Sequence, residues 1–265
     1  MTLKCWIISL TQDQAVVQTL KSALARQGIS AGIYPAVDGR ITMPALRVGE
    51  KIDQTLARCK RRATLTKSEV GCYLSHYRVI KDAYDQGAEH LCIFEDDVAA
   101  EEGIGDAIRE ITTLPPEYEL VRLMSLRIRR RKVVCNLSCG LRLVRPLRGA
   151  SGTQGYVINR RGMEKVIRKG GVMSKPIDKL YDHFWDIYLK CFSTEPHMVY
   201  EVGNESTIVK PKKRDLDKTP WVLVAWQAGK VVKSFKRYSY FIRHWREFIP
   251  AQLPEHKPGR TARMR

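Results

Sequence analysis

The sequence predicts an α/β fold with a mostly parallel sheet, followed by a basic helical segment at the C-terminus. Short apolar runs such as "CWIISL" and "HLCIF" alternate with segments whose apolar residues recur at helical spacing. Of the 265 residues, 44% are apolar, which is enough for a sizeable core. Strands that alternate with helices favour a sheet covered by helices on both faces. We expect this domain to span residues 1–205 and the C-terminal segment to span residues 206–265.

The expected elements follow one another in a strand–helix order. After the first strand, Val16, Leu20 and Leu24 define a helix that ends near Gly28. A second strand ends in a turn at Asp38, and a basic loop follows over residues 40–64. Thr66 and Glu69 form a capping box that opens the next helix. The later elements are expected as a strand at 90–94, a helix at 101–113, a strand at 118–124, two strands within 125–147, and a strand and helix within 152–171.

Three consecutive acids, Glu95, Asp96 and Asp97, directly follow the apolar strand "HLCIF". Unpaired carboxylates beside a core are costly to desolvate, so a cation is expected to meet them. Side chains alternate along an extended chain, which lets Glu95 and Asp97 face one ion. Such oxygen ligands suit Mn²⁺ or Mg²⁺. Helix capping or pairing with nearby arginines is the alternative.

Several quoted segments occur in an order that resembles a known family. They are "ISLTQDQ", "AVDG", "LTKSEVGCYLSHYRVIKDA", "IFEDDV", "LVRL", "GTQGYVINRRGMEKVI" and "KPIDKLYDHFW". Together they resemble glycosyltransferase family 25, the lipopolysaccharide and lipooligosaccharide galactosyltransferase type. The resemblance implies a GT-A-like nucleotide-sugar-binding domain. It also implies an inverting, metal-dependent transfer to a lipopolysaccharide core acceptor, with galactose from UDP-galactose as the favoured sugar. In this resemblance Glu95 and Asp97 match the acid-x-acid metal motif, with Asp97 as the direct ligand and Glu95 close by or bound through water.

The resemblance and the residue types suggest roles for further side chains. Inversion needs a carboxylate that takes the acceptor proton, and Asp178 or Asp182 is expected to do so. Contacts to the donor are expected from Ser9, Asp38, His76, Asp96 and Gly155. Contacts to the acceptor are expected from Gln154, Arg122 and Arg129. For each of them a structural role is the alternative: a buried histidine, a turn-forming aspartate, a tightly packed glycine or a solvated basic edge.

The charge is strongly uneven along the chain. The formal net charge is +18, and residues 205–265 supply +10 of it. An anionic partner follows from this balance. Nucleic acid is the less favoured partner because no recognition module is evident and acids would front the cleft. Seven cysteines, an odd number, fit a reducing compartment.

The C-terminal segment carries an apolar stripe at helical spacing. Its members are Val231, Phe235, Tyr238, Ile242, Trp245 and Ile249. Basic residues flank this stripe, a pattern typical of helices that lie in a membrane interface. We therefore expect a cytoplasmic protein bound peripherally to an anionic membrane surface, the inner face of a bacterial inner membrane. Packing of the stripe on the protein's own core is the alternative.

Overall fold

The computed structural model describes residues 2–11, 15–127, 129–138, 140–202 and 216–253. An eight-stranded sheet with the order β2-β1-β4-β9-β6-β11-β8-β7 forms its centre. Its strands are β1 (Leu3–Ser9), β2 (Gly32–Pro35), β4 (His90–Glu95), β6 (Leu120–Arg122), β7 (Arg131–Asn136), β8 (Arg142–Pro146), β9 (Gly155–Asn159) and β11 (Cys191–Glu195). The predicted α/β class is confirmed.

The sheet is mixed in its strand directions. Strands β2, β1 and β4 are parallel, and so are β6 and β11. Strand β9 runs antiparallel between β4 and β6, and β7 and β8 form an antiparallel hairpin beside β11. Two short pairs lie outside the sheet: β3 (Lys51–Ile52) with β10 (Val172–Met173), and β5 (Val98–Ala100) with β12 (Val199–Glu201). The parallel β2-β1-β4 part brings three strand ends to one edge.

Helices cover both faces of the sheet. Alternation along β1 and β4 sends Ile7 and Cys92 into one core and Ile8 and Ile93 into the other. The first core is closed by α1 (Ala15–Arg26) and α4 (Ile104–Thr113). The second is closed by α3 (Lys67–Asp85), α5 (Arg160–Gly170), α6 (Ile177–Asp182) and α7 (Phe184–Ile187). Burial against two helix layers therefore fixes the register of the sheet.

Two local signals in the sequence are confirmed at helix starts. The Thr66 hydroxyl accepts from the Glu69 amide, and the Glu69 carboxylate accepts from the Thr66 amide, so the capping box of α3 is complete. The Asn159 side chain caps α5 through the Gly162 amide at 2.9 Å. The region 40–64, expected as a loop, contains β3 and the helix α2 (Gln54–Arg61). Because α2 buries only Ala57, it lacks the apolar period that predicts a helix.

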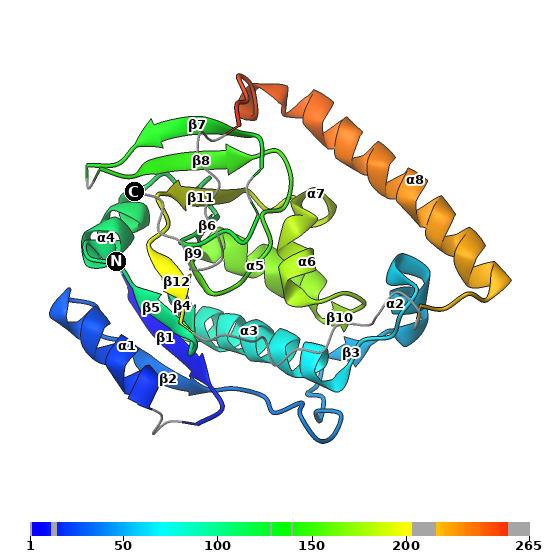
Figure 1. Ribbon diagram of the computed structural model, residues 1–265, viewed down its shortest axis with the longest axis horizontal. Helices are drawn as coiled ribbons and strands as arrows, with labels where there is room; N and C mark the ends of the chain where they lie inside the picture. The colour runs from blue at the N-terminus through cyan, green and yellow to red at the C-terminus, as the bar shows by residue number, and fades with distance from the viewer. Residues whose placement is uncertain (1, 12–14, 128, 139, 203–215, 254–265) are drawn as a thin grey trace.

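The C-terminal segment forms the helix α8 (Pro220–Arg243) and a short 3₁₀ turn, Trp245–Glu247. Figure 1 shows α8 along one outer edge of the molecule, between α2 at one end and the β7–β8 hairpin at the other. Tyr240 and Phe248 belong to the second core, and Phe184 lies between them in edge-on and stacked contacts. The helix is thus anchored on the domain. The remainder of the predicted segment, residues 206–215 and 254–265, lies outside the described residues.

No helix among the described residues combines the length and the apolar character needed to cross a membrane.

Candidate functional site

The carboxyl ends of β1, β2 and β4 meet at one edge of the sheet, and polar residues gather there. Ser9 ends β1, and its Oγ lies 2.6 Å from Asp96 Oδ2. Glu95 ends β4, so the acid triplet follows it directly. In open α/β sheets ligands bind outside such strand ends. The two residues Ser9 and Asp96, both predicted as donor contacts, are therefore brought together at an edge suited to a ligand.

Glu95 is held by a chain of hydrogen bonds. Its Oε1 accepts from the Thr153 hydroxyl and lies 3.3 Å from His76 Nε2. His76 Nδ1 is 3.0 Å from the Tyr156 hydroxyl, which in turn is 3.1 Å from that of Tyr181. Burial disfavours the charged carboxylate, but His76 and Thr153 outweigh it and lower the pKa of Glu95. Glu95 therefore stays ionised, and His76 orients it from the buried side.

Asp97 lies in a region of concentrated negative charge. Burial, together with the charges of Glu95, Asp96 and Glu201, raises the pKa of its carboxyl to about 7. Its backbone carbonyl accepts from Val202 at 2.8 Å, which ties the triplet to β12. A cluster of carboxylates of this kind is stabilised when a cation binds between them. The electrostatics thus fit the predicted metal ligands Asp97 and Glu95.

Gln154 lies directly before β9 and contacts this cluster. Its Nε2 donates to Glu201 Oε1 at 2.8 Å, while its Oε1 is buried without a hydrogen-bond partner in the described part of the chain. Buried amide oxygens are rarely left unpaired, so a ligand or ion is the expected partner. Gln154 was predicted to contact the acceptor. The structure places it beside the acid triplet.

Among the described residues, one group of three metal-ligating atoms lies close together, and it includes Glu95 of the acid triplet. Cys72 Sγ, His76 and Glu95 offer ligand atoms that lie within 4.8 Å of one another. Burial, with the nearby carboxylates, raises the pKa of the Cys72 thiol well above its usual range. A protonated thiol is a poor ligand, and a metal binds thiolate. The oxygen-rich set around Asp97 therefore fits Mn²⁺ or Mg²⁺ better than the set that includes Cys72.

The two aspartates of α6 have different surroundings. Asp182 is buried and contacts Arg122 Nη2 at 3.1 Å, Lys179 Nζ at 2.8 Å and the Ser151 amide at 2.9 Å. Burial acts to raise its pKa, but Arg122 and Lys179 outweigh it and lower the pKa to about 2. Asp178 is half-buried and pairs with Lys179 at 3.0 Å. Of the two predicted bases, Asp178 is therefore the one with an accessible carboxylate.

The two arginines predicted to contact the acceptor, Arg122 and Arg129, also differ in their surroundings. Arg122 is buried and occupied by Asp182, so it holds the site together rather than facing solvent. Arg129 lies on the loop after β6 and donates weakly to the Gly149 carbonyl at 3.4 Å. The Arg127 amide on this loop bonds to the Ala150 carbonyl at 2.8 Å, just before the segment that carries Thr153. This hydrogen bond joins the loop of Arg127 and Arg129 to the segment that leads to Thr153.

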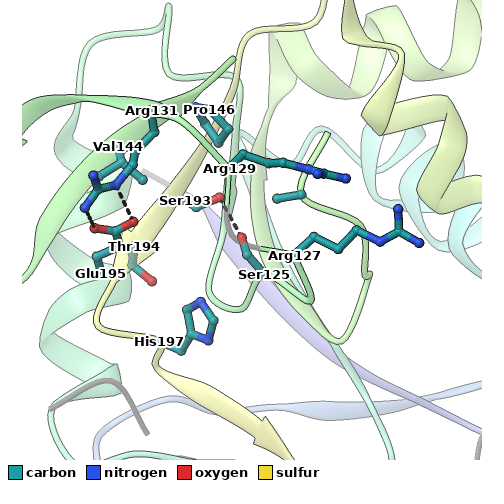
Figure 2. A pocket seen from close by; sticks show the side chains of 11 residues that line it. Ser125, Arg127, Arg129, Arg131, Val144, Pro146, Ser193, Thr194, Glu195 and His197 are labelled. Atoms are coloured by element: carbon teal, nitrogen blue, oxygen red, sulfur yellow. Dashed lines mark hydrogen bonds and ion pairs between the residues drawn. The ribbon is translucent and has the colours of Figure 1, made fainter. Parts of the chain in front are cut away.

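A small polar hollow lies behind this loop (Figure 2). Figure 2 shows the side chains of Arg127 and Arg129 extending to the same side, away from the ion pair of Arg131 with Glu195. That pair is bidentate at 2.8 and 2.9 Å, so Arg131 is neutralised inside the fold. Of the arginines that line this hollow, Arg127 and Arg129 are the two that are not held by the Glu195 carboxylate.

Asp38 and Gly155 occupy positions that favour structural roles. Asp38 follows β2 at the ligand edge, is exposed, and binds the Arg40 guanidinium at 2.7 Å. Gly155 is buried between strands, where an added Cβ would lie 3.0 Å from Val199 and 3.3 Å from Phe94. The glycine is therefore explained by strand packing. In the described part of the chain, neither Asp38 nor Gly155 forms a side-chain hydrogen bond or an ion pair with the carboxylates of the acid cluster.

Comparison with known proteins agrees with this geometry. The family model described as "Glycosyltransferase family 25 (LPS biosynthesis protein)" matches residues 2–181. The chain belongs to glycosyltransferase family 25. The family resemblance predicted from the quoted motifs is confirmed.

Relatives within family 25 differ in what they do. Procollagen galactosyltransferase 1 of Danio rerio is 25% identical over 256 residues, covering 86% of this chain and 42% of its own length. LgtE of Neisseria gonorrhoeae, a lacto-N-neotetraose biosynthesis glycosyltransferase, is 26% identical over 206 residues, covering 74% of this chain and 70% of its own. A probable inactive family member 3 of Rattus norvegicus is 33% identical over 99 residues, covering 37% of this chain and 17% of its own. This chain therefore spans less than half the length of its animal relatives.

Among solved structures, a Drosophila galactosyltransferase 7 in complex with manganese, UDP-Gal and xylobiose matches with a TM-score of 0.40 and 9% identity. The match covers 83% of this chain and 80% of that one. A similarity of this size supports no argument about the site.

Proposed function

We propose that this protein is a metal-dependent, inverting glycosyltransferase. The donor is a nucleotide-sugar, with UDP-galactose favoured, and the acceptor is a lipopolysaccharide core or lipooligosaccharide. The observation that carries the proposal is the carboxylate cluster of Glu95, Asp97 and Glu201 at the ligand edge of a family 25 chain. The procollagen galactosyltransferase relatives support galactose as the sugar. The description of the family model as an LPS biosynthesis protein and the LgtE relatives support an acceptor of the lipopolysaccharide class.

The site residues divide the work in this proposal. Asp97 and Glu95 hold Mn²⁺ or Mg²⁺, which when bound neutralises the diphosphate of the donor as its charge develops. Ser9 and Asp96 face the donor from the end of β1. His76 keeps Glu95 oriented through its hydrogen bond. Gln154, with its unpaired amide oxygen, orients a polar group of the donor or acceptor.

Asp178 acts as the general base in this proposal. Its carboxylate is half-exposed, so an acceptor hydroxyl can approach it. Asp182 accepts from four donors, and a carboxyl with a pKa of about 2 is a weak base. Arg127 and Arg129 are placed to bind an anionic group of the acceptor, since guanidinium groups bind phosphate and carboxylate in bidentate fashion.

The test is a transfer assay with UDP-galactose and a core oligosaccharide, measured as UDP release with Mn²⁺ present. Asp97→Asn should abolish turnover while the melting temperature stays nearly unchanged, and a chelator should inactivate the wild type reversibly. Glu164→Gln, an exposed acid on α5, is the matched control and should keep full activity. Full activity of Asp97→Asn in the presence of chelator would exclude the metal role.

A catalytically silent family member is the second candidate. The relatives described as inactive favour it, since the rat protein is 33% identical over 99 residues of this chain. Calorimetric titration of UDP-galactose with Mn²⁺ separates the two functions. Binding without UDP release, on any core acceptor and with either ion, would support the silent protein and contradict the transferase.

A further inference from the structure

The outward face of α8 is apolar, and it is directed away from the protein. Val222 and Tyr240, the two buried residues of this helix, are 18 residues apart and therefore share one side of it. Val231 is nine residues from each, or two and a half turns, and so points the opposite way. It is 70% exposed, and its neighbours Phe235 and Ile242 are 72% and 76% exposed.

The other members of the predicted stripe share this exposure. Tyr238, Trp245 and Ile249 are each more than half exposed. The protein's core is therefore filled by a different face of the helix, and packing of the stripe on the core, the alternative left by the sequence, does not occur in the structure. A contiguous row of large apolar side chains on a rigid helix marks an interaction surface.

Charge limits what can cover this surface. The 24 residues of α8 include five Lys or Arg and no Asp or Glu. At 100° per residue, Lys230 and Arg237 lie along one flank of the apolar row, and Lys236 and Arg243 lie along the other. Lys233 lies on the side of the helix nearer the domain, where Lys175 and Asp186 act on it, although its side chain stays exposed. The apolar row is thus bordered by cations on both flanks.

A second copy of this chain fits the surface poorly. Pairing of two α8 helices would bring two sets of five like charges together, on chains that each carry a net charge of +18. An anionic lipid surface instead matches both features, because the acyl region accepts the apolar row while long basic side chains reach the headgroups. Aromatic residues such as Tyr238 and Trp245 suit the interface between the two regions.

The helix is held at both ends, as membrane docking of a rigid element requires. At its start, Trp221 and Trp226 stack on Arg58 and Arg62 of the α2 region at 5.2 Å each. At its end, Tyr240 packs in the core. The helix is about 36 Å long at 1.5 Å per residue, so it presents an extended, preformed face.

We propose that the outward face of α8 binds the surface of an anionic lipid bilayer and holds the protein there peripherally. Attachment at the cytoplasmic face of a bacterial inner membrane, expected from the sequence, is part of this proposal. It goes beyond the proposed transferase activity and does not depend on it. A lipid-linked acceptor would then lie on the same surface as the enzyme.

The test is co-sedimentation of the full chain with vesicles of phosphatidylcholine containing 30% phosphatidylglycerol, compared with pure phosphatidylcholine. We expect binding to the anionic vesicles at 50 mM salt and strong weakening at 500 mM salt, because surface charges are screened. Lys230→Gln with Lys236→Gln and Arg243→Gln should reduce partitioning on the order of a hundredfold, at about fivefold per cation. The control replaces three exposed basic residues away from α8, Lys21, Arg161 and Lys169, by Gln and should reduce it far less.

The apolar contribution is tested separately. Phe235→Ser with Ile242→Ser should abolish sedimentation. The control, Ile41→Ser with Val48→Ser, changes two residues outside α8 that are at least as exposed, and it should not. All four side chains are exposed, so each variant should melt like the wild type. Three results would overturn the proposal: no binding by the wild type at low salt, equal effects of test and control variants, or self-association in light scattering that Phe235→Ser removes. Transfer to a soluble acceptor should be unchanged in these variants, so failure here is distinct from failure of the proposed transferase.

Discussion

Asp182 is predicted to stabilise the fold rather than to accept the acceptor proton, and Asp182→Asn tests this. The pKa of its carboxyl falls from 3.8 to about 2 on folding, mainly because Arg122 and Lys179 outweigh the effect of burial. At about 1.4 kcal/mol per pKa unit, this linkage amounts to about 2 kcal/mol at neutral pH. The substitution also leaves Arg122 buried without an anion, and breaking a buried pair costs about 3–5 kcal/mol. We therefore expect a loss of at least 2 kcal/mol.

The pH dependence of this loss follows from the sign of the shift. A lowered pKa stabilises the folded state above the unfolded pKa of 3.8, and the stabilisation disappears as the pH falls through about 2. The difference in unfolding free energy between wild type and Asp182→Asn should be constant above about pH 5 and fall by about 1 kcal/mol at pH 3. Urea unfolding at pH 7, 5 and 3 measures it. Asp178→Asn is the control: it should change stability little while lowering turnover by about two to four orders of magnitude.

The result that would refute this reasoning is a stable Asp182→Asn. A loss below about 0.5 kcal/mol at pH 7, combined with a large loss of turnover, would mean that Asp182 acts in the chemistry. Near-wild-type turnover in both variants would place the base elsewhere.

Three further predictions concern packing, each measured by urea or thermal unfolding. Gly39→Ala should cost about 1–3 kcal/mol, because its Cβ would lie 2.1 Å from the Lys67 carbonyl oxygen; a neutral result would show that this loop shifts freely. Gly229→Ala should stabilise the protein by about 0.5–1 kcal/mol, since this position in α8 faces open space; destabilisation would contradict a continuous helix there. Arg145→Lys should lower the melting temperature, by roughly 2–4 °C for each kcal/mol lost, because the guanidinium stacks on three aromatic rings and lysine cannot; an unchanged melting temperature would contradict the stacking.

The parts of the site that follow a strand end could be predicted from the sequence. Ser9 and the acid triplet each come directly after an apolar run, and parallel strands bring such ends to one edge. The hydrogen bond between Ser9 and Asp96 confirms that the two segments meet, although 87 residues separate them. The position of residues at a strand end can be predicted from the hydrophobic periodicity of the chain alone.

Contacts made by non-local pairing could not be predicted. Glu201 reaches the acid cluster because β12 pairs antiparallel with β5, and no feature of the segment around it indicates that partner. Thr153 and Tyr156 reach Glu95 and His76 because β9 inserts antiparallel between β4 and β6. A strand's apolar pattern shows which residues are buried, but it does not identify the strand that lies beside it. The mixed sheet therefore appears only in the structure.

The C-terminal helix also shows what the sequence pattern alone cannot determine. Helical spacing placed Phe235, Ile242 and the other stripe residues on one face, and the structure confirms that they share it. Periodicity cannot decide whether such a face turns inward or outward, because the core and a membrane interface select the same residues. In the structure, Tyr240 of α8 and Phe248, which follows the helix, both pack against Phe184. The side of α8 opposite the stripe therefore faces the core. With that side of the helix occupied, the flanking cations and the exposed apolar row face outward together, and this combination is the basis of the proposed docking to anionic lipid.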